Sequence, residues 1–458
     1  MIAGLAALAL AVASRPPNVV VIFCDDLGFG DLSCYGNRAY KTPNLDRMAS
    51  EGMRFTNFYA ASPACSPSRA ALLTGCYPVR VSVPEVLGPD SETGLNPQET
   101  NIASMLRPLG YATACVGKWH LGVKNLMPTR QGFDTFFGLP YSHDMWPANG
   151  KNWPPLWLYK DDAPIEEIKS LDDQAQLTKK YTSFASDFIR ANKNRPFFLY
   201  LPHSMPHVPL AASRSFLGKS GAGLYGDVIQ EIDWSVGEIL KTIRQAGLDK
   251  NTLVFFSSDN GPWRPYGDHA GSTGGLREGK GTTFEAGFRE PGIFRWPGKI
   301  PAGSVSNEVA TTMDLLPTIA SLAGAKLPEA KVDGHDIRPL IFAEPGAKTP
   351  WKWFYYYWPD QLQAVRSGDW KLHVPHKHRH QTEPAGRNGK PAGEVTAEIG
   401  LALFDLSKDP AESTNVADQH PDVVRRLMRL IEIGRRELGD TITKAKGTDV
   451  RPPGKVTP

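Results

Sequence analysis

Four short apolar runs, each followed at once by polar residues, constrain the fold of this chain more than any other feature. The runs cover residues 18–23, 112–116, 197–201 and 253–256. Continuous apolar runs of this length suit strands that are buried on both faces of a parallel sheet. Helical patterns at 43–52, 177–192 and 228–246 alternate with them. The sequence therefore predicts an α/β fold with a large, mostly parallel central sheet flanked by helices.

The character of the sequence changes near residue 345. Two short runs at 370–374 and 401–406 and a helical pattern at 423–433 predict a smaller C-terminal antiparallel sheet plus a helix. We therefore divide the chain into an N-terminal segment (1–16), a catalytic α/β domain (17–345) and a C-terminal antiparallel-sheet subdomain (346–458). The Lys- and Pro-rich tail from Lys444 is expected to be loose.

Composition narrows the function classes. The chain has 458 residues, 41% hydrophobic and 22% charged, which is typical of a soluble protein with a large core. A net charge of +3 gives no case for nucleic-acid binding and suits a small anionic substrate held by local cations. Five cysteines, an odd number, do not form a disulfide framework.

The first 14 residues are rich in Ala and Leu, and Ala11-Val12-Ala13 is similar to a signal-peptidase cleavage site. They are too few to span a bilayer, and we expect no integral membrane segment elsewhere. The segment is interpreted as an export signal, with a ragged N-terminus as the alternative.

Carboxylates follow the first and the fourth apolar run. Asp25 and Asp26 come directly after one, and Asp259 and Asn260 after the other. Adjacent carboxylates repel unless a cation neutralises them, and oxygen ligands suit Ca²⁺ or Mg²⁺. Because the carboxyl ends of parallel strands meet at one edge, a shared metal is favoured over mere capping of turns.

Basic side chains follow the remaining runs or stand in stiff or glycine-rich loops. Lys118 and His120 come after the second run, His207 lies in Pro-His-Val-Pro, and Lys280 lies between two glycines. Each alone could be an exposed lysine or a histidine bonded to a nearby turn. Their shared placement predicts a cationic pocket for an anion.

A cysteine stands at the start of a predicted helix. Ser66 suits its N-cap, Pro67 its first position and Gly75 its end. Cys65 would then lie at the positive end of the helix, with Arg69 one turn away. The pattern indicates an anion site with a reactive group, the alternative being a buried structural cysteine.

This stretch, Cys-Ser-Pro-Ser-Arg followed by Thr74-Gly75, resembles the signature of the formylglycine-dependent sulfatases. The chain as a whole is similar to arylsulfatase A-like type I sulfatases of the alkaline-phosphatase-like superfamily. The segments that carry the resemblance are 17–28, 30–32, 34–36, 42–46, 65–75, 117–122, 141–144, 259–262, 279–291 and 406–410.

The resemblance implies two cofactors. Calcium, or magnesium, would be bound by Asp25, Asp26, Cys65, Asp259 and Asn260. Cys65 would be oxidised by a maturation enzyme to formylglycine, whose hydrate would attack the sulfur of a sulfate ester.

The resemblance also implies roles for the basic side chains. His207 and Lys280 would contact the sulfate, and one of them would protonate the leaving oxygen. His120 would take a proton from the second hydroxyl of residue 65, so that sulfate is expelled. Arg69 and Lys118, together with the hydroxyl of Ser142, would hold residue 65 and its sulfate adduct.

The expected function is hydrolysis of a small-molecule or carbohydrate sulfate ester, aryl sulfates included, with release of inorganic sulfate. A phosphomonoesterase or phosphodiesterase on the same scaffold and an inactive carbohydrate-binding relative are the alternatives. The resemblance and the N-terminal segment favour an exported enzyme, bacterial periplasmic or extracellular.

Two segments allow more than one interpretation. The basic, histidine-rich residues 376–400 could be a solvated hairpin tip, a substrate-recognition rim or a weak adventitious metal site. The aromatic residues between 351 and 358 could be core or could stack on a sugar.

Overall fold

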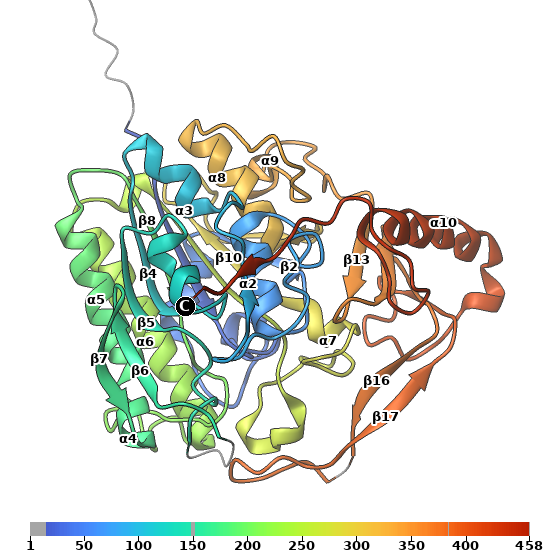
Figure 1. The fold of residues 1–458 in the computed structure, drawn as a ribbon, viewed down its shortest axis with the longest axis horizontal. Coiled ribbons are helices and arrows are strands. Elements are labelled where there is room, and N and C mark those ends of the chain that lie inside the picture. The colour runs from blue at the N-terminus through green and yellow to red at the C-terminus, as the bar shows by residue number, and fades with distance from the viewer. Residues whose placement is uncertain (1–14, 148–151, 383, 458) are drawn as a thin grey trace, which may run out of the picture.

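A large mixed sheet runs through the computed structural model of the chain, which describes residues 15–147, 152–382 and 384–457 (Figure 1). Its strand order is β11-β2-β10-β9-β1-β8-β4-β5-β6-β7, with β12 beside β2. The central strands are parallel: β5 (Thr135–Leu139), β4 (Ala112–Lys118), β8 (Phe197–Pro202), β1 (Asn18–Cys24) and β9 (Thr252–Ser258). All four apolar runs are thus strands of one parallel centre, as predicted.

Antiparallel pairing is confined to the two sides of this centre. On one side β10 (Arg289–Arg295) runs antiparallel to β9 and to β2 (Met53–Tyr59). Beyond it, β11 (Ser304–Ser306) and β12 (Ala310–Thr311) pair parallel with β2. On the other side the antiparallel strands are β6 (Leu156–Lys160) and β7 (Ala163–Ile168).

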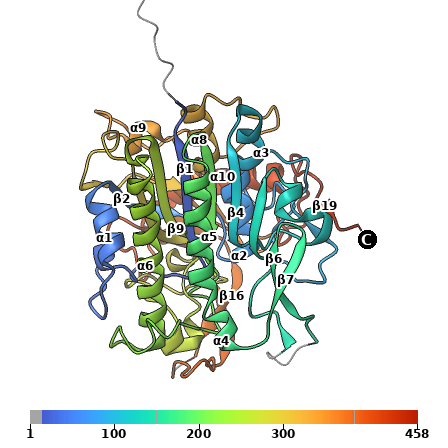
Figure 2. The same ribbon diagram turned by 90° about the vertical axis from the view of Figure 1, so that its left-hand side faces the viewer.

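Helices cover both faces of the sheet, which is why the central strands are apolar throughout. One layer contains α1 (Pro43–Ser50), α5 (Leu177–Ala191) and α6 (Gly223–Gln245), which lie in front of the sheet in Figure 2. The other layer contains α2 (Cys65–Thr74), α3 (Ile102–Leu106) and α8 (Leu315–Ala323). Short helices α4 (Leu171–Gln174), α7 (Glu285–Phe288) and α9 (Arg338–Ile341) lie in the connections.

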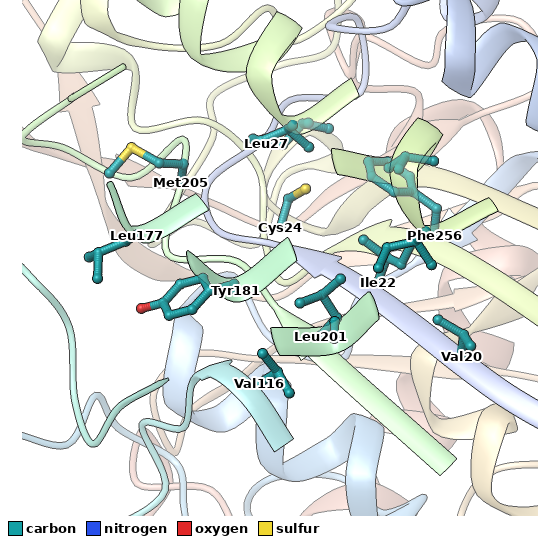
Figure 3. Packing of buried hydrophobic residues seen from close by; sticks show 14 of the residues in the cluster. Val20, Ile22, Cys24, Leu27, Val116, Leu177, Tyr181, Leu201, Met205 and Phe256 are labelled. Atoms are coloured by element: carbon teal, nitrogen blue, oxygen red, sulfur yellow. The ribbon is translucent and has the colours of Figure 1, made fainter. Parts of the chain in front are cut away.

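The side chains of β1 alternate between two buried clusters. Val20 and Ile22 pack with Leu201 of β8 and Tyr181 of α5 (Figure 3). Val21 and its alternate neighbours point to the opposite face, where α2, α3 and α8 pack. This period of two fixes the register of the central strands, and with it the positions of the polar residues that follow them.

The C-terminal part contains the expected smaller antiparallel sheet and helix. Its strands are β13 (Phe354–Tyr357), β14 (Leu362–Ser367), β15 (Trp370–His373) and β18 (Ala402–Asp405), and α10 (Pro421–Leu438) packs on them. All four residues of β13 are buried, so the core interpretation is confirmed for Tyr355, Tyr356 and Tyr357. It does not extend to Trp353 and Trp358, which flank the strand and are only partly buried. A separate hairpin, β16 (His376–Gln381) and β17 (Glu394–Ile399), extends from this sheet.

The expectation of a loose tail is wrong. β19 (Gly454–Lys455) pairs antiparallel with β3 (Thr93–Gly94). The backbone N–H of Arg451 donates to the carbonyl of Arg80 over 2.8 Å, and its side chain donates to Glu99. Backbone pairing with the α/β part therefore holds a segment whose composition alone indicated disorder.

The expected export segment lies mostly outside the described residues. Among the helices that the structure does describe, none combines the length and the apolar character needed to cross a membrane. The boundary between residues 345 and 346 stays a prediction.

Candidate active site

The carboxyl ends of the central strands open onto a pocket with a volume of about 160 Å³. The side chains from four strand ends and from α2 meet there, although they are far apart in sequence. The pocket is lined by Ala64, Cys65, Val86, His120, Ser142, Asp144, Met145, His207, Trp263, Lys280, Gly281, Trp358 and Arg379. The carboxylates expected at this edge lie directly beside it.

Cys65 is the first residue of α2, whose ten residues are all buried. The helix begins two residues earlier than predicted: Ala64 is the N-cap, and Ser66 does not cap it. The Ser66 hydroxyl instead accepts a hydrogen bond from the backbone N–H of Leu87 over 3.0 Å. Gly75 ends the helix with φ +69°, as predicted. Cys65 still occupies the N-terminal turn, where the helix dipole favours negative charge.

Arg69 links the ends of three strands through its hydrogen bonds. Its side chain is fully buried, and it donates to Asp259 over 2.7 and 3.0 Å and to Asp25 over 3.0 Å. A third donor reaches the backbone carbonyl of Lys118 over 3.0 Å. One guanidinium therefore fixes the ends of β1, β4 and β9 relative to Cys65.

Three cations balance the three carboxylates of this cluster. Besides Arg69, Lys118 is ion-paired with Asp25, and Lys280 contacts both oxygens of Asp26 at 2.8 and 2.9 Å. Burial alone would raise the pKa of Asp25, but Lys118 and Arg69 hold it well below its usual range. The carboxylate is therefore ionised in a fully buried position.

Two buried oxygens in this cluster have no hydrogen-bond partner among the described residues: Oδ1 of Asp25 and Oδ1 of Asn260. In addition, one ligand atom each from Asp25, Asp26, Cys65 and His207 lies within 4.8 Å of the others. Orphaned buried oxygens are costly unless something binds them. A donor set dominated by oxygen fits a hard divalent cation such as Ca²⁺ or Mg²⁺.

The β4 end supplies two groups to the pocket. Lys118 donates to the hydroxyl of Ser142 over 3.0 Å. The His120 ring donates from Nε2 to the backbone carbonyl of Leu87 over 2.7 Å, which leaves Nδ1 as the unprotonated nitrogen. That Nδ1 is buried and has no partner among the described residues, and burial together with Lys118 holds the pKa of His120 well below its usual value. His120 is therefore a neutral base.

His207 and Lys280 form the opposite wall. His207 Nδ1 donates to the carbonyl of Val208 over 2.5 Å, and Nε2 lies 3.6 Å from Asp26. Burial and Lys280 lower the pKa of His207 to about 4. His143, which the sequence analysis did not select, bonds to the carbonyl of His207 over 3.0 Å and so supports the loop.

All the site residues expected from the sequence are thus brought into one region. Sequence reasoning did not select Asp144, Met145 or Trp263, which also line the pocket. Trp358 and Arg379 line it too, and both lie in segments for which a role in substrate recognition was kept open. Trp263 follows Asn260 by three residues, so its place after β9 was a usable signal. Arg379 lies in the histidine-rich segment whose recognition-rim interpretation had been kept open.

Cys65 at a helix N-terminus, a cluster of oxygen ligands suited to a metal and a pocket lined by cationic side chains lie together at one sheet edge. This arrangement is typical of enzymes that hydrolyse esters of oxyanions. Comparison with known proteins is more specific. The sulfatase family model matches residues 17–325, and a model of the C-terminal region of aryl-sulfatase matches residues 349–451. The chain belongs to the sulfatase family, and it is a sulfuric ester hydrolase.

Similar proteins cover nearly the whole chain. Human arylsulfatase A is 42% identical over 93% of this chain and 88% of its own length. Mouse N-acetylgalactosamine-6-sulfatase is 39% identical over 94% and 88%. Among solved structures, the PsFucS1 sulfatase from a Pseudoalteromonas species matches with a TM-score of 0.84 at 29% identity, covering 95% of this chain and 92% of that one.

Proposed function

We propose that this sulfatase hydrolyses carbohydrate or aryl sulfate esters through a formylglycine formed from Cys65, and that it acts outside the cytoplasm after export. The observation that carries the proposal is the position of Cys65, at the N-terminus of α2 in a pocket that also contains Lys280, His207 and His120. The metal and a maturation enzyme are the partners that this chemistry requires.

The unmodified thiol is poorly suited to catalysis here. Burial and the Asp25 carboxylate raise the pKa of Cys65 to about 12, so the thiolate is scarce at neutral pH. Oxidation to an aldehyde and hydration would replace the thiol by two geminal hydroxyls on the same carbon. One hydroxyl can attack sulfur, while the other retains a proton that is needed later.

Lys280, His207 and Lys118 receive the sulfate group. The attacking oxygen forms a bond to sulfur as the bond from sulfur to the alcohol oxygen breaks, and His207 or Lys280 delivers a proton to the alcohol oxygen. The proton that the attacking hydroxyl loses replaces the one delivered, so the donor ends the step as it began. Burial would lower the pKa of Lys280, yet Asp26 raises it above its usual value, so the ammonium stays charged beside the ester. A divalent cation at Asp25, Asp26, Asp259 and Asn260 would supply further positive charge to the sulfate oxygens.

His120 acts in the second half of the reaction. Its unprotonated Nδ1 takes the proton from the remaining hydroxyl of residue 65. The carbon–oxygen bond to sulfate then breaks, the aldehyde re-forms, and water hydrates it again. This route avoids attack of water on a second sulfate ester.

The test compares sulfate with phosphate esters of the same alcohols, using protein matured in a host that modifies such cysteines. Conversion of Cys65 removes about 18 Da from the intact mass, which identifies matured protein. We expect inorganic sulfate to be released from the sulfate esters faster than phosphate from the matched phosphates. A faster release of phosphate would establish the phosphatase alternative, and fully matured protein that releases neither ion would favour the inactive relative.

Removal of the metal gives a second prediction. Chelation should abolish sulfate release and lower the thermal midpoint, because the orphaned oxygens of Asp25 and Asn260 lose their partner. At a cation concentration of 100 to 1,000 times Kd, the lost stabilisation is about 3–4 kcal/mol. Calorimetry with Ca²⁺ or Mg²⁺ added back identifies the metal, and unchanged stability and activity after exhaustive chelation would exclude the site.

A further inference from the structure

The active-site pocket does not end at the sulfate-binding side chains. A second cavity with a volume of about 340 Å³ continues from it and shares Asp144, Met145 and Trp263 with it. The alcohol part of a substrate whose sulfate lies at Cys65 must extend into this space or past its rim. The two cavities together therefore form the leaving-group cleft.

An aromatic wall borders this cleft. The rings of Trp263 and Tyr266 are 4.9 Å apart, edge to face. Trp263 also packs against the His207 ring at 5.7 Å and lies 4.6 Å from Nζ of Lys280. Its ring is thus fixed beside the groups that bind sulfate, in a position to pack against the apolar face of a sugar ring.

Arg379, from β16 of the C-terminal hairpin, also lines the active-site pocket. Its side chain is exposed, and a Cβ placed on Gly281 would lie 3.5 Å from its guanidinium. Among the described residues, Arg379 makes no hydrogen bond or ion pair through its side chain. The carboxylate of Glu278, in the same loop as Lys280, is instead bound by His380 at 2.7 Å and Arg264 at 3.5 Å.

The hairpin that carries Arg379 is anchored rather than free. In its pairing with β17, Arg379 lies opposite Thr396. Beyond β16, the N–H groups of Gly386 and Ala392 both donate to the carbonyl of Pro265, over 3.1 and 2.8 Å. Pro265 directly precedes Tyr266 of the aromatic wall, so the wall and the hairpin are tied together.

These observations give Arg379 a role that the reaction itself does not need. In the proposed reaction Lys118, His207 and Lys280 act on the single sulfate that is cleaved, whereas Arg379 is an additional cation at the lining of the pocket. We infer that Arg379 selects substrates in which a sugar bears a second anionic group, a carboxylate or another sulfate, beside the sulfate that is removed. The inference rests on the proposed function and names the substrate class of the same site.

The chemistry of the guanidinium supports this assignment. Its planar fork donates two parallel hydrogen bonds to a carboxylate or sulfate, which a lysine ammonium cannot reproduce. Its side chain is exposed and lines the same pocket as Trp263, so an anionic group on a sugar bound there lies within its reach. Neutral alcohols gain nothing from it, so it discriminates between substrates and does not accelerate all of them.

The experiment compares four sulfate esters with matured protein: a neutral aryl monosulfate, a neutral hexose monosulfate, a hexose disulfate, and a disaccharide with a uronate beside the sulfated sugar. For the wild type we expect one or both of the doubly anionic sugars to exceed the hexose monosulfate in kcat/KM. Arg379→Gln should lower kcat/KM for the preferred sugar by about 10- to 50-fold, mainly through KM, and change the neutral esters less than about 3-fold. Comparison of kcat/KM for the disulfate and for the uronate disaccharide shows whether Arg379 prefers a sulfate or a carboxylate.

Two variants control the result. Lys377→Gln removes a positive charge from the same strand, at a side chain that pairs with Glu398 outside the pocket, and should leave all four rates nearly unchanged. Arg379→Lys should recover only part of the selectivity. Equal losses on neutral and doubly anionic esters, or a wild type that prefers the neutral hexose, would overturn the inference while leaving sulfate hydrolysis intact. Failure on all four esters would instead contradict the proposed function.

Discussion

Cys65→Ala is expected to eliminate turnover of every sulfate ester. Loss of a catalytic nucleophile costs about 10⁴- to 10⁶-fold in kcat in enzymes where the catalytic groups act as a unit. Here the substitution removes the thiol that must be oxidised to give the aldehyde and leaves an unreactive methyl group, while α2 retains its buried packing. Sulfate release measured by ion chromatography at high enzyme concentration checks the result.

A matched control removes a different buried thiol. Cys115 lies in β4, is fully buried and is not one of the residues that line the pocket. Cys115→Ala should lose some stability from the cavity but retain its kcat within a few-fold. Activity in Cys65→Ala above one hundredth of the wild-type level would mean that another group attacks sulfur.

The central sheet and its catalytic edge could be predicted because two simple rules act together. Apolar runs without alternation specify strands buried on both faces, and parallel strands place their carboxyl ends at one edge. Asp25, Lys118, His207 and Asp259 therefore had to approach one another, whatever the loops between them do. Only the local start of α2 was misjudged, since Ser66 bonds to Leu87, a partner 21 residues away.

The rim of the cleft could not be predicted in the same way. Arg379 reaches the pocket only because a hairpin from the C-terminal sheet crosses to the Pro265 loop through backbone hydrogen bonds. These hydrogen bonds join backbone N–H and C=O groups, which every residue except proline offers alike. The pattern of side chains in the sequence therefore does not predict them. The paired tail at Gly454 escaped prediction for the same reason.

Residues at the sheet edge and residues at the rim should control different properties of the enzyme, namely its rate and its choice of substrate. The groups to which we assign sulfate binding come from the sheet edge and follow from the rules that build the fold. Trp263 and Arg379, which we propose meet the alcohol, come from the loop after β9 and from the C-terminal part. Substitutions at the rim should therefore change which ester is cleaved, whereas those at the edge should change how fast any ester is cleaved.

His120→Ala should slow the release of sulfate from residue 65 far more than its attachment. The His120 ring is held by Leu87 so that its free Nδ1 remains a base, and a base is needed only when the second hydroxyl loses its proton. General-base assistance is worth about 10²- to 10⁴-fold. We expect a rapid burst of one equivalent of alcohol, followed by slow turnover, and protein that carries about 80 Da of added sulfate by mass.

His120 has φ +58°, a left-handed conformation in which asparagine is tolerated better than most residues. His120→Asn therefore provides a second variant that preserves the backbone while removing the base, and it should accumulate the same sulfated protein. His335→Ala, whose ring packs on Trp351 away from the pocket, should show neither burst nor accumulation. If alcohol and sulfate slow in parallel in both His120 variants and no added mass is found, His120 acts in the first step, and another group must deprotonate residue 65.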